Sequence, residues 1–366
     1  MKSFLKKSIA ERIVQFVGTT LYGMAGVLTK ETAEWYLKYN RGYTALDKYT
    51  TIQNEAAELL AKYESCLFLD GLTDLSDAAA ESFGNHAGKL SLRSLTQLSD
   101  SAAVSLSRNK GELNLYSLAE LSDKAAESLS KHEGGLRLCS LTQLSNAAAA
   151  SLSHYNGSLD LNGLTQLSDS VAESLSNYKG VLSLERLTYL SDEAAESLRK
   201  HDGGLCLCSL TQLSNAAAAS LSHYKGTLNL NGLTQVSEKV AQNLGQHVGG
   251  LFVASLTRLS DSVVESFSRN KGDLNLSGLS SLSEAAAESL GRHEGALHLY
   301  GLDTLSDKAA EYLSKHRGAI YLNREAKLSK AATGTLTMCR DLYWVTHNKP
   351  DPCLPFKPKY AFSRTR

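Results

Sequence analysis

Three sets of side chains in this sequence could do chemistry: a set of histidines, a Cys-x-Cys pair and a set of serines. Histidine can transfer protons or bind metals, paired cysteines can bind zinc, and serine can act as a nucleophile. The histidines are spaced by multiples of 23 residues, at His86, His132, His201, His247, His293 and His316. The same spacing also leads to Tyr155, Tyr178, Tyr224, Asn109 and Asn270. A position that accepts histidine, tyrosine and asparagine fills a structural role, so we predict that it hydrogen-bonds a neighbouring turn.

The cysteines and serines also lack the partners that reactive sites need. Cys206 and Cys208 fall on one face of a predicted strand, without a histidine or further cysteine in register to complete a zinc site. The serines run from Ser76 to Ser329 without the G-x-S-x-G turn that activates a nucleophile, and no Walker or dinucleotide-binding motif is present. We therefore predict that the chain is not an enzyme and holds no metal or cofactor. The cysteines show no disulfide framework, so we expect free thiols and a reducing compartment for Cys66, Cys139, Cys206, Cys208, Cys339 and Cys353.

All three sets belong to one 23-residue repeat. Its first leucine recurs without insertion or deletion at Leu67, Leu90, Leu113, Leu136, Leu159, Leu182, Leu205, Leu228, Leu251, Leu274, Leu297 and Ile320. Numbered from that leucine, the pattern is L-x-L-x-x-L-x-x-L-S-[DNE]-x-A-A-x-S-L-x-x-[HYN]-x-G-x. A fixed period of this length is typical of a solenoid, and it overrides the expectation of two or three domains for a chain of 366 residues.

The repeat positions predict one strand and one helix in each copy. Leucines at positions 1 and 3 alternate as in a half-buried strand, and leucines at 6 and 9 fill the interior. Serine at 10 followed by Asp or Asn begins a helix, because the hydroxyl can accept from a free N–H and the acid suits the positive end of the helix dipole. Positions 13, 17 and 20 face inward, and glycine at 22 ends the helix at a residue where φ is often positive.

The outward helix face and the helix thickness predict two further features. Strands stack at roughly 4.8 Å and helices at roughly 8–10 Å, so thin, alanine-rich helices favour an open horseshoe or arc with the parallel sheet on its concave face.

On the outward face of the helices, acidic residues precede basic ones by four positions, the order that favours ion pairs. These pairs are Glu127/Lys131, Glu196/Lys200, Glu265/Arg269, Glu288/Arg292 and Glu311/Lys315.

With its L-x-L-x-x-L strand, Leu-Ser-Asp step and Ala-Ala-x-x-Leu helix, the pattern resembles the leucine-rich repeat over roughly residues 44–342. It is closest to the cysteine-containing subclass of F-box proteins, although its 23-residue repeat is shorter and more like bacterial repeats. Leucine stands where that subclass has cysteine or asparagine, at Leu72, Leu95, Leu118 and Leu141. We recognise no F-box-like segment before the array. The resemblance implies an α/β leucine-rich-repeat solenoid of about twelve strand–turn–helix repeats, without a ubiquitin-ligase role.

Residues 1–43 do not fit the repeat and form the first of four predicted segments. An apolar stripe at helical spacing runs through Phe4, Leu5, Ile9, Ile13, Phe16 and Val17, with basic residues beside it. Two interpretations stay open. The segment is either a helical cap over the first coil, as solenoids require, or an anchor in which residues 1–30 associate with a membrane or a partner protein.

The remaining segments are a degenerate capping repeat at 44–66, the array at 67–342 and a Pro-rich basic tail at 343–366. In the capping repeat, Ser-Asp has become Gln53-Asn54. Residues 138–155 and 207–224 are identical, which indicates duplication of a three-repeat block. The tail holds all four prolines, so we predict neither helix nor central strand there, and expect it to wrap the last coil or reach a partner.

Positions 2 and 4 line the concave sheet, the surface that leucine-rich repeats typically use for binding. The middle of this surface is small and polar, as at Asn229 and Asn231. Its C-terminal part carries large rings, the class of residue that most often anchors interfaces. We predict that these rings bind a partner, or alternatively that they only cover the sheet: Phe252, His298, Tyr300 and Tyr321.

These features favour a non-enzymatic protein-interaction or assembly scaffold that uses its concave face, its terminal segments, or both. Lysine plus arginine equals aspartate plus glutamate at 38 each, so no overall field attracts nucleic acid. We expect protein partners, no nucleic acid, no small-molecule substrate and a cytoplasmic location. The alternative is a membrane-associated or envelope protein, tethered by residues 1–30, with the array projecting as a structural or adhesive module.

Overall fold

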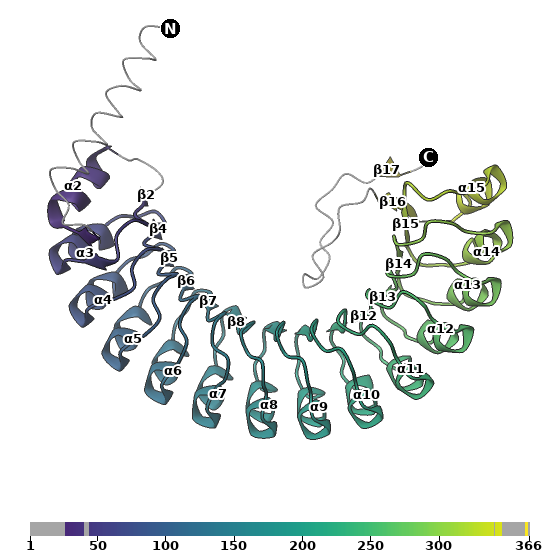
Figure 1. Cartoon of the computed structure of the whole chain (residues 1–366), viewed down its shortest axis with the longest axis horizontal. Coiled ribbons are helices and arrows are strands. Elements are labelled where there is room, and N and C mark those ends of the chain that lie inside the picture. Colours follow the sequence, from purple (N-terminus) through teal and green to yellow (C-terminus); the bar gives the residue numbers. More distant parts are fainter. Residues whose placement is uncertain (1–25, 40–43, 340, 346–362, 365–366) are drawn as a thin grey trace, which may run out of the picture. The chain divides into compact units, whose positions relative to one another are not determined.

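The computed structural model describes residues 26–39, 44–339, 341–345 and 363–364. The chain divides into two compact units, Met1–Gly163 and Leu164–Arg366. Each unit is a stack of coils, and each coil contributes one short strand and one helix (Figure 1). This is the α/β leucine-rich-repeat architecture that the sequence predicts. The arc of the whole chain stays a prediction.

In unit 1 the strands pair in parallel in the order β2, β4, β5, β6, β7, β8, with the first leucine of each coil opposite the next, as Leu67 lies opposite Leu90. A separate two-stranded sheet joins β1 to β3. The elements are β1 (Val27–Leu28), α2 (Lys30–Tyr39), β2 (Thr44–Ala45), β3 (Thr51–Ile52), α3 (Asn54–Ala61), β4 (Leu67–Phe68), α4 (Asp77–Gly84), β5 (Leu90–Ser91), α5 (Asp100–Leu106), β6 (Leu113–Asn114), α6 (Asp123–Leu129), β7 (Leu136–Arg137), α7 (Asn146–Leu152) and β8 (Leu159–Asp160).

In unit 2 the strands β9 to β16 pair in parallel, and β17 pairs with β16 in the antiparallel direction. The elements are α8 (Asp169–Leu175), β9 (Leu182–Ser183), α9 (Asp192–Leu198), β10 (Leu205–Cys206), α10 (Asn215–Ser222), β11 (Leu228–Asn229), α11 (Glu238–Leu244), β12 (Leu251–Phe252), α12 (Asp261–Ser268), β13 (Leu274–Asn275), α13 (Glu284–Gly291), β14 (Leu297–Leu299), α14 (Asp307–Leu313), β15 (Ile320–Asn323), α15 (Lys330–Leu336), β16 (Leu342–Val345) and β17 (Ser363–Arg364).

The core of each coil lies between its strand and its helix. In the β10 coil, Leu205, Leu207 and Leu210 at positions 1, 3 and 6 are buried. The alanines at positions 13 and 14 and the leucine at 17 are buried beneath them, as predicted. Position 9 differs from the expectation, because most of its leucines, such as Leu213, are only half-buried. That position lies at the outer turn, where the chain has left the strand.

Serine at position 10 is the N-cap of every helix from α4 to α15, and its Oγ accepts from the backbone N–H three residues on. Where position 11 of the preceding coil is aspartate, the same hydroxyl also donates to that carboxylate. Ser191 Oγ donates to Asp169 Oδ1 at 2.5 Å, and Ser283 Oγ to Asp261 Oδ1 at 2.5 Å. A ladder of serine–aspartate rungs therefore links successive helix starts.

The ladder depends on the length of the acidic side chain. Position 11 is glutamate at Glu238 and Glu284. Within the described residues, the capping serine of the coil that follows each of them donates no hydrogen bond to the glutamate carboxylate. Ser260 instead shares a hydrogen bond with Ser262 at 2.9 Å, and Ser262 Oγ donates to Glu238 at 2.7 Å. The extra methylene carries the glutamate carboxylate past the serine that an aspartate would reach.

The glycines at position 22 correct one prediction. Among the described residues, positive φ occurs at Gly26 alone, so the position-22 glycines do not end their helices in the left-handed region. A Cβ added at Gly203 would instead collide with the carbonyl oxygen of Gly180 in the preceding coil, and one at Gly226 with that of Gly203. Glycine is needed because the backbones of neighbouring coils touch at this turn.

The residues at position 20 form a buried column beside these glycines. Four rings stack in sequence through Tyr178, His201, Tyr224 and His247, with centroids 5.9–6.3 Å apart. The predicted hydrogen bond to a neighbouring turn is confirmed for His247, whose Nε2 lies 3.1 Å from Gly226 O, and for Asn270, whose Nδ2 donates to His247 O at 2.6 Å. His201 and His316 differ, since their ring nitrogens lack hydrogen-bond partners among the described residues. His201 stacks between Tyr178 and Tyr224, and His316 stacks on His293.

The outward ion pairs are confirmed at four of the five predicted positions: Glu127/Lys131, Glu265/Arg269, Glu288/Arg292 and Glu311/Lys315. The prediction for Glu196 and Lys200 is wrong. Glu196 instead pairs with Arg199, three residues away, and accepts from Ser220 Oγ of the next coil at 2.9 Å. The Glu196 carboxylate is thus held between Arg199 and Ser220.

The ends of the array extend past the predicted boundaries. Thr44 lies opposite Leu67, in the register expected for a degenerate repeat, and β1 and α2 stack one further strand and helix before it. Residues 342–345 form strand β16 between β15 and β17, so the start of the predicted tail is a central strand, contrary to expectation. The apolar stripe from Phe4 to Val17 and all four prolines lie outside the described residues.

Candidate partner-binding site

The aromatic side chains predicted to bind a partner lie on or directly after three strands of unit 2, β12, β14 and β15. Residues at position 2 face one another across the parallel strands, in the order Phe252, Asn275, His298, Tyr321 and Tyr343. Tyr300 lies two residues beyond His298 and therefore on the same face of the sheet. We call Phe252, His298, Tyr300, Tyr321 and Tyr343 the aromatic ladder.

The rings of the ladder are in contact. His298 stacks on Tyr321 with centroids 4.6 Å apart, and Tyr321 stacks on Tyr343 at 5.0 Å. Phe252 and Tyr300 meet His298 edge-on, at 6.2 and 5.6 Å. Stacked and edge-on rings at these separations attract one another beyond simple burial. The structure therefore brings all four predicted residues into one cluster.

Tyr343 belongs to the ladder but was missed from the sequence. It follows Tyr321 by 22 residues, one fewer than the repeat, because Ile320 pairs with Leu342. The alternation of Leu342, Tyr343 and Trp344 is the signal that could have identified this strand. Trp344 faces Leu322 in register, where other coils have a leucine.

The ladder has two buried members and three more accessible ones. His298 and Tyr300 are 5% and 7% exposed, while Phe252, Tyr321 and Tyr343 are half-buried. The hydroxyl of Tyr300 shares a 2.7 Å hydrogen bond with His298 Nδ1, which fixes the histidine ring in its stacked orientation. The half-buried rings are the surface that another molecule can touch.

Burial favours the uncharged forms of His298, Tyr300 and Tyr321. Burial lowers the pKa of His298 to about 4, against an opposing effect of Asp273. Burial raises the pKa of Tyr300 and also that of Tyr321, where Tyr343, Asp273 and Asp341 add to the shift. Neutral rings with hydroxyl groups suit a surface that is partly apolar and still able to hydrogen-bond.

The small polar residues of the sheet face have structural roles. Asn229 Oδ1 accepts from the N–H of Asn231 at 3.1 Å, and Asn231 Oδ1 accepts from the N–H of Ala254 at 2.8 Å. These side chains satisfy backbone groups where each strand ends. The Asn229 and Asn231 side chains thus hold the backbone in place, and weak binding by the middle of the sheet stays a prediction.

The prediction of free thiols is wrong at one site on this face. Cys206 and Cys208 are joined by a disulfide, whereas Cys66, Cys139 and Cys339 are free among the described cysteines. Cys206 ends strand β10 and Cys208 lies in the turn that follows it, and the two sulfur atoms meet there. Within the described residues, His, Cys, Asp and Glu side chains form no group of three that could hold a metal ion.

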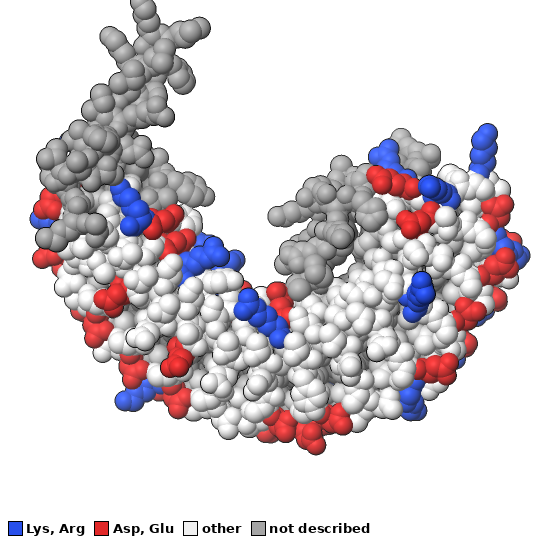
Figure 2. All heavy atoms as spheres, in the orientation of Figure 1, with Lys and Arg blue, Asp and Glu red and all other residues white. Residues whose placement is uncertain are grey.

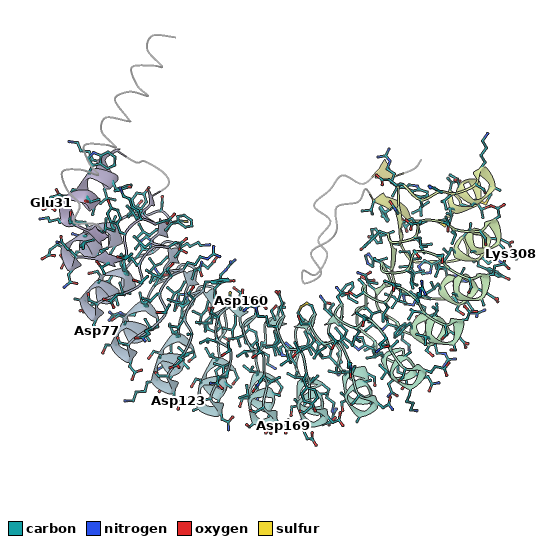
Figure 3. The ribbon with its side chains drawn as sticks, in the orientation of Figure 1. Glu31, Asp77, Asp123, Asp160, Asp169 and Lys308 are labelled. Atoms are coloured by element: carbon teal, nitrogen blue, oxygen red, sulfur yellow. A yellow bond between two sulfur atoms is a disulfide. The ribbon has the colours of Figure 1, made fainter. Side chains whose placement is uncertain are left out.

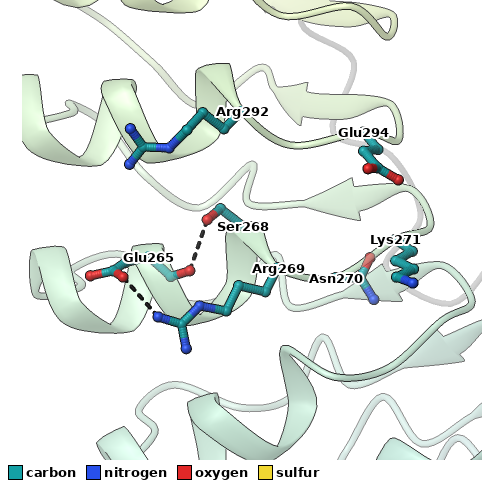
Figure 4. A pocket seen from close by; sticks show the side chains of 7 residues that line it. All are labelled: Glu265, Ser268, Arg269, Asn270, Lys271, Arg292 and Glu294. Carbon is teal, nitrogen blue, oxygen red and sulfur yellow. Dashed lines mark hydrogen bonds and ion pairs between the residues drawn. The ribbon is translucent and has the colours of Figure 1, made fainter.

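A charged depression of about 340 Å³ lies at the C-terminal ends of α12 and α13 (Figure 4). Its arginines are held by ion pairs, Arg269 with Glu265 at 2.8 Å and Arg292 with Glu288 at 2.9 Å. The lining thus combines basic side chains, Arg269, Lys271 and Arg292, with the acidic Glu265 and Glu294. Acidic and basic side chains are likewise mixed along the helices of each unit (Figure 2). Asp77 and Asp123, two rungs of the serine–aspartate ladder, lie on the helix side of unit 1 (Figure 3).

Comparisons with known proteins give a limited result. No family model matches the chain, and no curated protein matches it. Three solved structures are similar: an internalin of Listeria monocytogenes (17% identity, 85% of this chain, 88% of that chain, TM-score 0.49), a leucine-rich-repeat protein of Leptospira interrogans (20%, 80%, 77%, 0.47) and a chain of the Toll–Spatzle complex of Drosophila (14%, 81%, 41%, 0.49). All three TM-scores are below 0.5. The leucine-rich-repeat fold rests on the coil register described above.

Proposed function

We propose that this chain is a non-enzymatic protein-interaction or assembly module that binds its partner through the aromatic ladder. The observation that carries the proposal is the concentration of five contacting rings on or directly after strands β12, β14, β15 and β16, beyond the small polar side chains of Asn229 and Asn231. Aromatic residues dominate the energy of protein interfaces when they cluster in this way. The resemblance to the F-box subclass adds no ubiquitin-ligase role.

The residues of the aromatic ladder have two roles in this proposal: some contact the partner, and the others hold the contacting rings in place. Phe252, Tyr321 and Tyr343 are half-buried and supply apolar area that a partner can cover. Tyr300 and His298 lie beneath and fix the orientation of Tyr321 through the hydrogen bond and the stack. A rigid aromatic surface loses little side-chain entropy on binding, which favours affinity.

Affinity purification from the source organism tests the proposal. The full chain, Tyr321→Ala and Tyr189→Ala serve as three baits. Tyr189 is a matched control, because it is 74% exposed on a turn of the same unit, away from the ladder. We expect a protein that the wild type and Tyr189→Ala retain and that Tyr321→Ala loses. Identical recoveries from all three baits would move the binding site off the ladder.

Tethering to a membrane through residues 1–30 is the competing proposal. It is supported by the uncharged stretch from Ile13 to Thr29, which lies largely before the described residues. Among the described residues, no helix combines the length and apolar character required to cross a membrane. Extraction by alkaline carbonate would separate the two proposals, since a cytoplasmic protein module dissolves at moderate salt whereas an inserted segment resists both treatments.

A further inference from the structure

Cys206 and Cys208 lie two residues apart on the sheet face of one coil. Their Cα atoms are 5.7 Å apart, within the usual range for a disulfide. The two residues are 5% and 9% exposed and are therefore largely buried on the sheet face. The bridge runs from the end of β10 to the turn that follows it within one coil, and it does not join two coils.

A single residue distinguishes this site from a second copy of the same segment. Residues 203–224 repeat residues 134–155 with one difference, Arg137 in place of Cys206. In that copy Cys139 has no neighbour to pair with, and its Sγ donates to Asp160 Oδ2 at 3.1 Å. Burial, followed by the hydrogen bond and charge of Asp160, raises the pKa of Cys139 to about 12. The chain thus contains an unpaired cysteine in a segment of almost identical sequence, with Asp160 in the next coil where the Cys208 site has Asn229.

The fold around the pair is complete without the sulfur–sulfur bond. Leu205 and Leu207 are buried in the core, and Leu205 lies in register with Leu182 and Leu228. The N–H groups of both leucines donate to the next strand at 2.9 Å. A bridge across one intervening residue removes little entropy from the unfolded chain, since the effect grows with loop length. Neither the core nor the backbone hydrogen bonds require the oxidised form.

We propose that Cys206 and Cys208 are a reversible dithiol–disulfide site that exchanges with low-molecular-weight thiols such as glutathione. In reduction, a glutathione thiolate attacks Sγ of Cys208, the sulfur–sulfur bond breaks and Cys206 leaves as a thiolate. A second glutathione thiolate attacks the sulfur of the bound glutathione, and Cys208 leaves as a thiolate with glutathione disulfide as product. Two electrons pass to the protein, and solvent supplies two protons to the cysteines. Oxidation follows the reverse order.

The full-length protein is equilibrated in buffers with a range of reduced-to-oxidised glutathione ratios, then alkylated and cleaved for mass spectrometry. We expect the peptide that contains Cys206 and Cys208 to change between a doubly alkylated form and an unalkylated disulfide in one two-electron transition. The Cys139 peptide should show no intramolecular disulfide at any ratio. The melting temperatures of the two forms should agree within about 2 °C, because the bridge adds little to stability.

The variant Cys206→Arg recreates the sequence around Cys139 and supplies the matched control. Its Cys208 should lose the two-electron transition and remain alkylatable, or carry one glutathione that added thiol removes. The proposal is overturned if the wild-type peptide is alkylated at both cysteines at every ratio. It is also overturned if reduction occurs only above the melting temperature, or if Cys208 of the variant gives the same transition as the wild type.

Discussion

The ring of His298 stacks on the ring of Tyr321 from the next coil, with centroids 4.6 Å apart and planes inclined by 2°. The contact follows from the parallel register, which places the two residues opposite each other at position 2. It joins a buried ring to a half-buried one. The orientation of the accessible tyrosine is therefore set by a residue that a partner need not touch.

Loss of a tyrosine from the aromatic ladder should lower the affinity for the main partner. We expect Tyr321→Ala and Tyr300→Ala each to reduce binding by more than ~1 kcal/mol, which corresponds to a rise in Kd of roughly fivefold or more. Tyr321 acts by contact and Tyr300 through His298, so Tyr300→Phe should have a smaller effect than Tyr300→Ala. Isothermal titration calorimetry against the purified partner measures these values. Tyr116→Ala, which removes a sheet-face tyrosine of unit 1, and Asn229→Ala should leave the affinity unchanged. Equal affinities for all variants would reject the ladder as the contact surface.

Replacement of a position-22 glycine should disrupt coil stacking. We expect Gly203→Ala to lower the free energy of unfolding by ~1–3 kcal/mol or more, because its Cβ would collide with the backbone of Gly180. The neighbouring Gly204→Ala is the control, since its Cβ would meet nothing nearer than Val181 Cγ1 at 3.4 Å. Gly334→Ala, in open space within α15, should raise stability by ~0.5–1 kcal/mol. Urea unfolding compares the three variants, and similar losses for Gly203→Ala and Gly204→Ala would contradict the close-approach explanation.

The serine–aspartate ladder predicts opposite effects for two charge-conserving changes. Asp307→Glu should break the rung to Ser329 and cost ~0.5–1.5 kcal/mol, the usual value of one hydrogen bond. Glu284→Asp should create a rung to Ser306 and stabilise by a similar amount. Both variants keep the negative charge at the helix start, so effects of the dipole cancel. Thermal unfolding of the two variants checks the pair, and a loss of stability in both would show that residue size, not the rung, is responsible.

The buried histidines should make the fold sensitive to acid. Burial lowers the pKa of His86, His201, His247 and His293, and it lowers that of His316 to about 4, with His293 adding to the shift. Protons therefore bind the unfolded chain more readily than the folded one below the ordinary histidine pKa of 6.5. The contribution of these neutral histidines to the free energy of unfolding is fully present above about pH 6.5. It is lost as the pH decreases toward about 4.

Denaturant unfolding between pH 7.5 and 4.5 measures this dependence. His316→Asn is the informative variant, because Asn109 and Asn270 already occupy the same column. We expect its stability to fall less steeply with decreasing pH than that of the wild type. An unchanged slope would mean that groups other than the position-20 histidines control the acid response.

The repeat period was sufficient to predict the coil. A constant spacing of 23 residues brings each first leucine opposite the next, and the position of serine before an acidic residue marks each helix start. These features are local, or they depend only on counting, so a single sequence reveals them. The same reasoning placed Phe252, His298, Tyr300 and Tyr321 on one face. It missed Tyr343, because the last coil is one residue shorter and the count no longer applies.

The sequence by itself determined the strand–turn–helix coil, its register, its N-caps and the face on which the aromatic residues lie. The tertiary structure alone decided why position 22 is glycine, because that depends on the distance between neighbouring backbones. It also decided that Ser191 reaches Asp169 while Glu196 turns toward Ser220, and that Tyr300 supports His298 beneath Tyr321. Each of these contacts joins atoms whose separation depends on how coils stack and side chains rotate, and a pattern of residue types records neither.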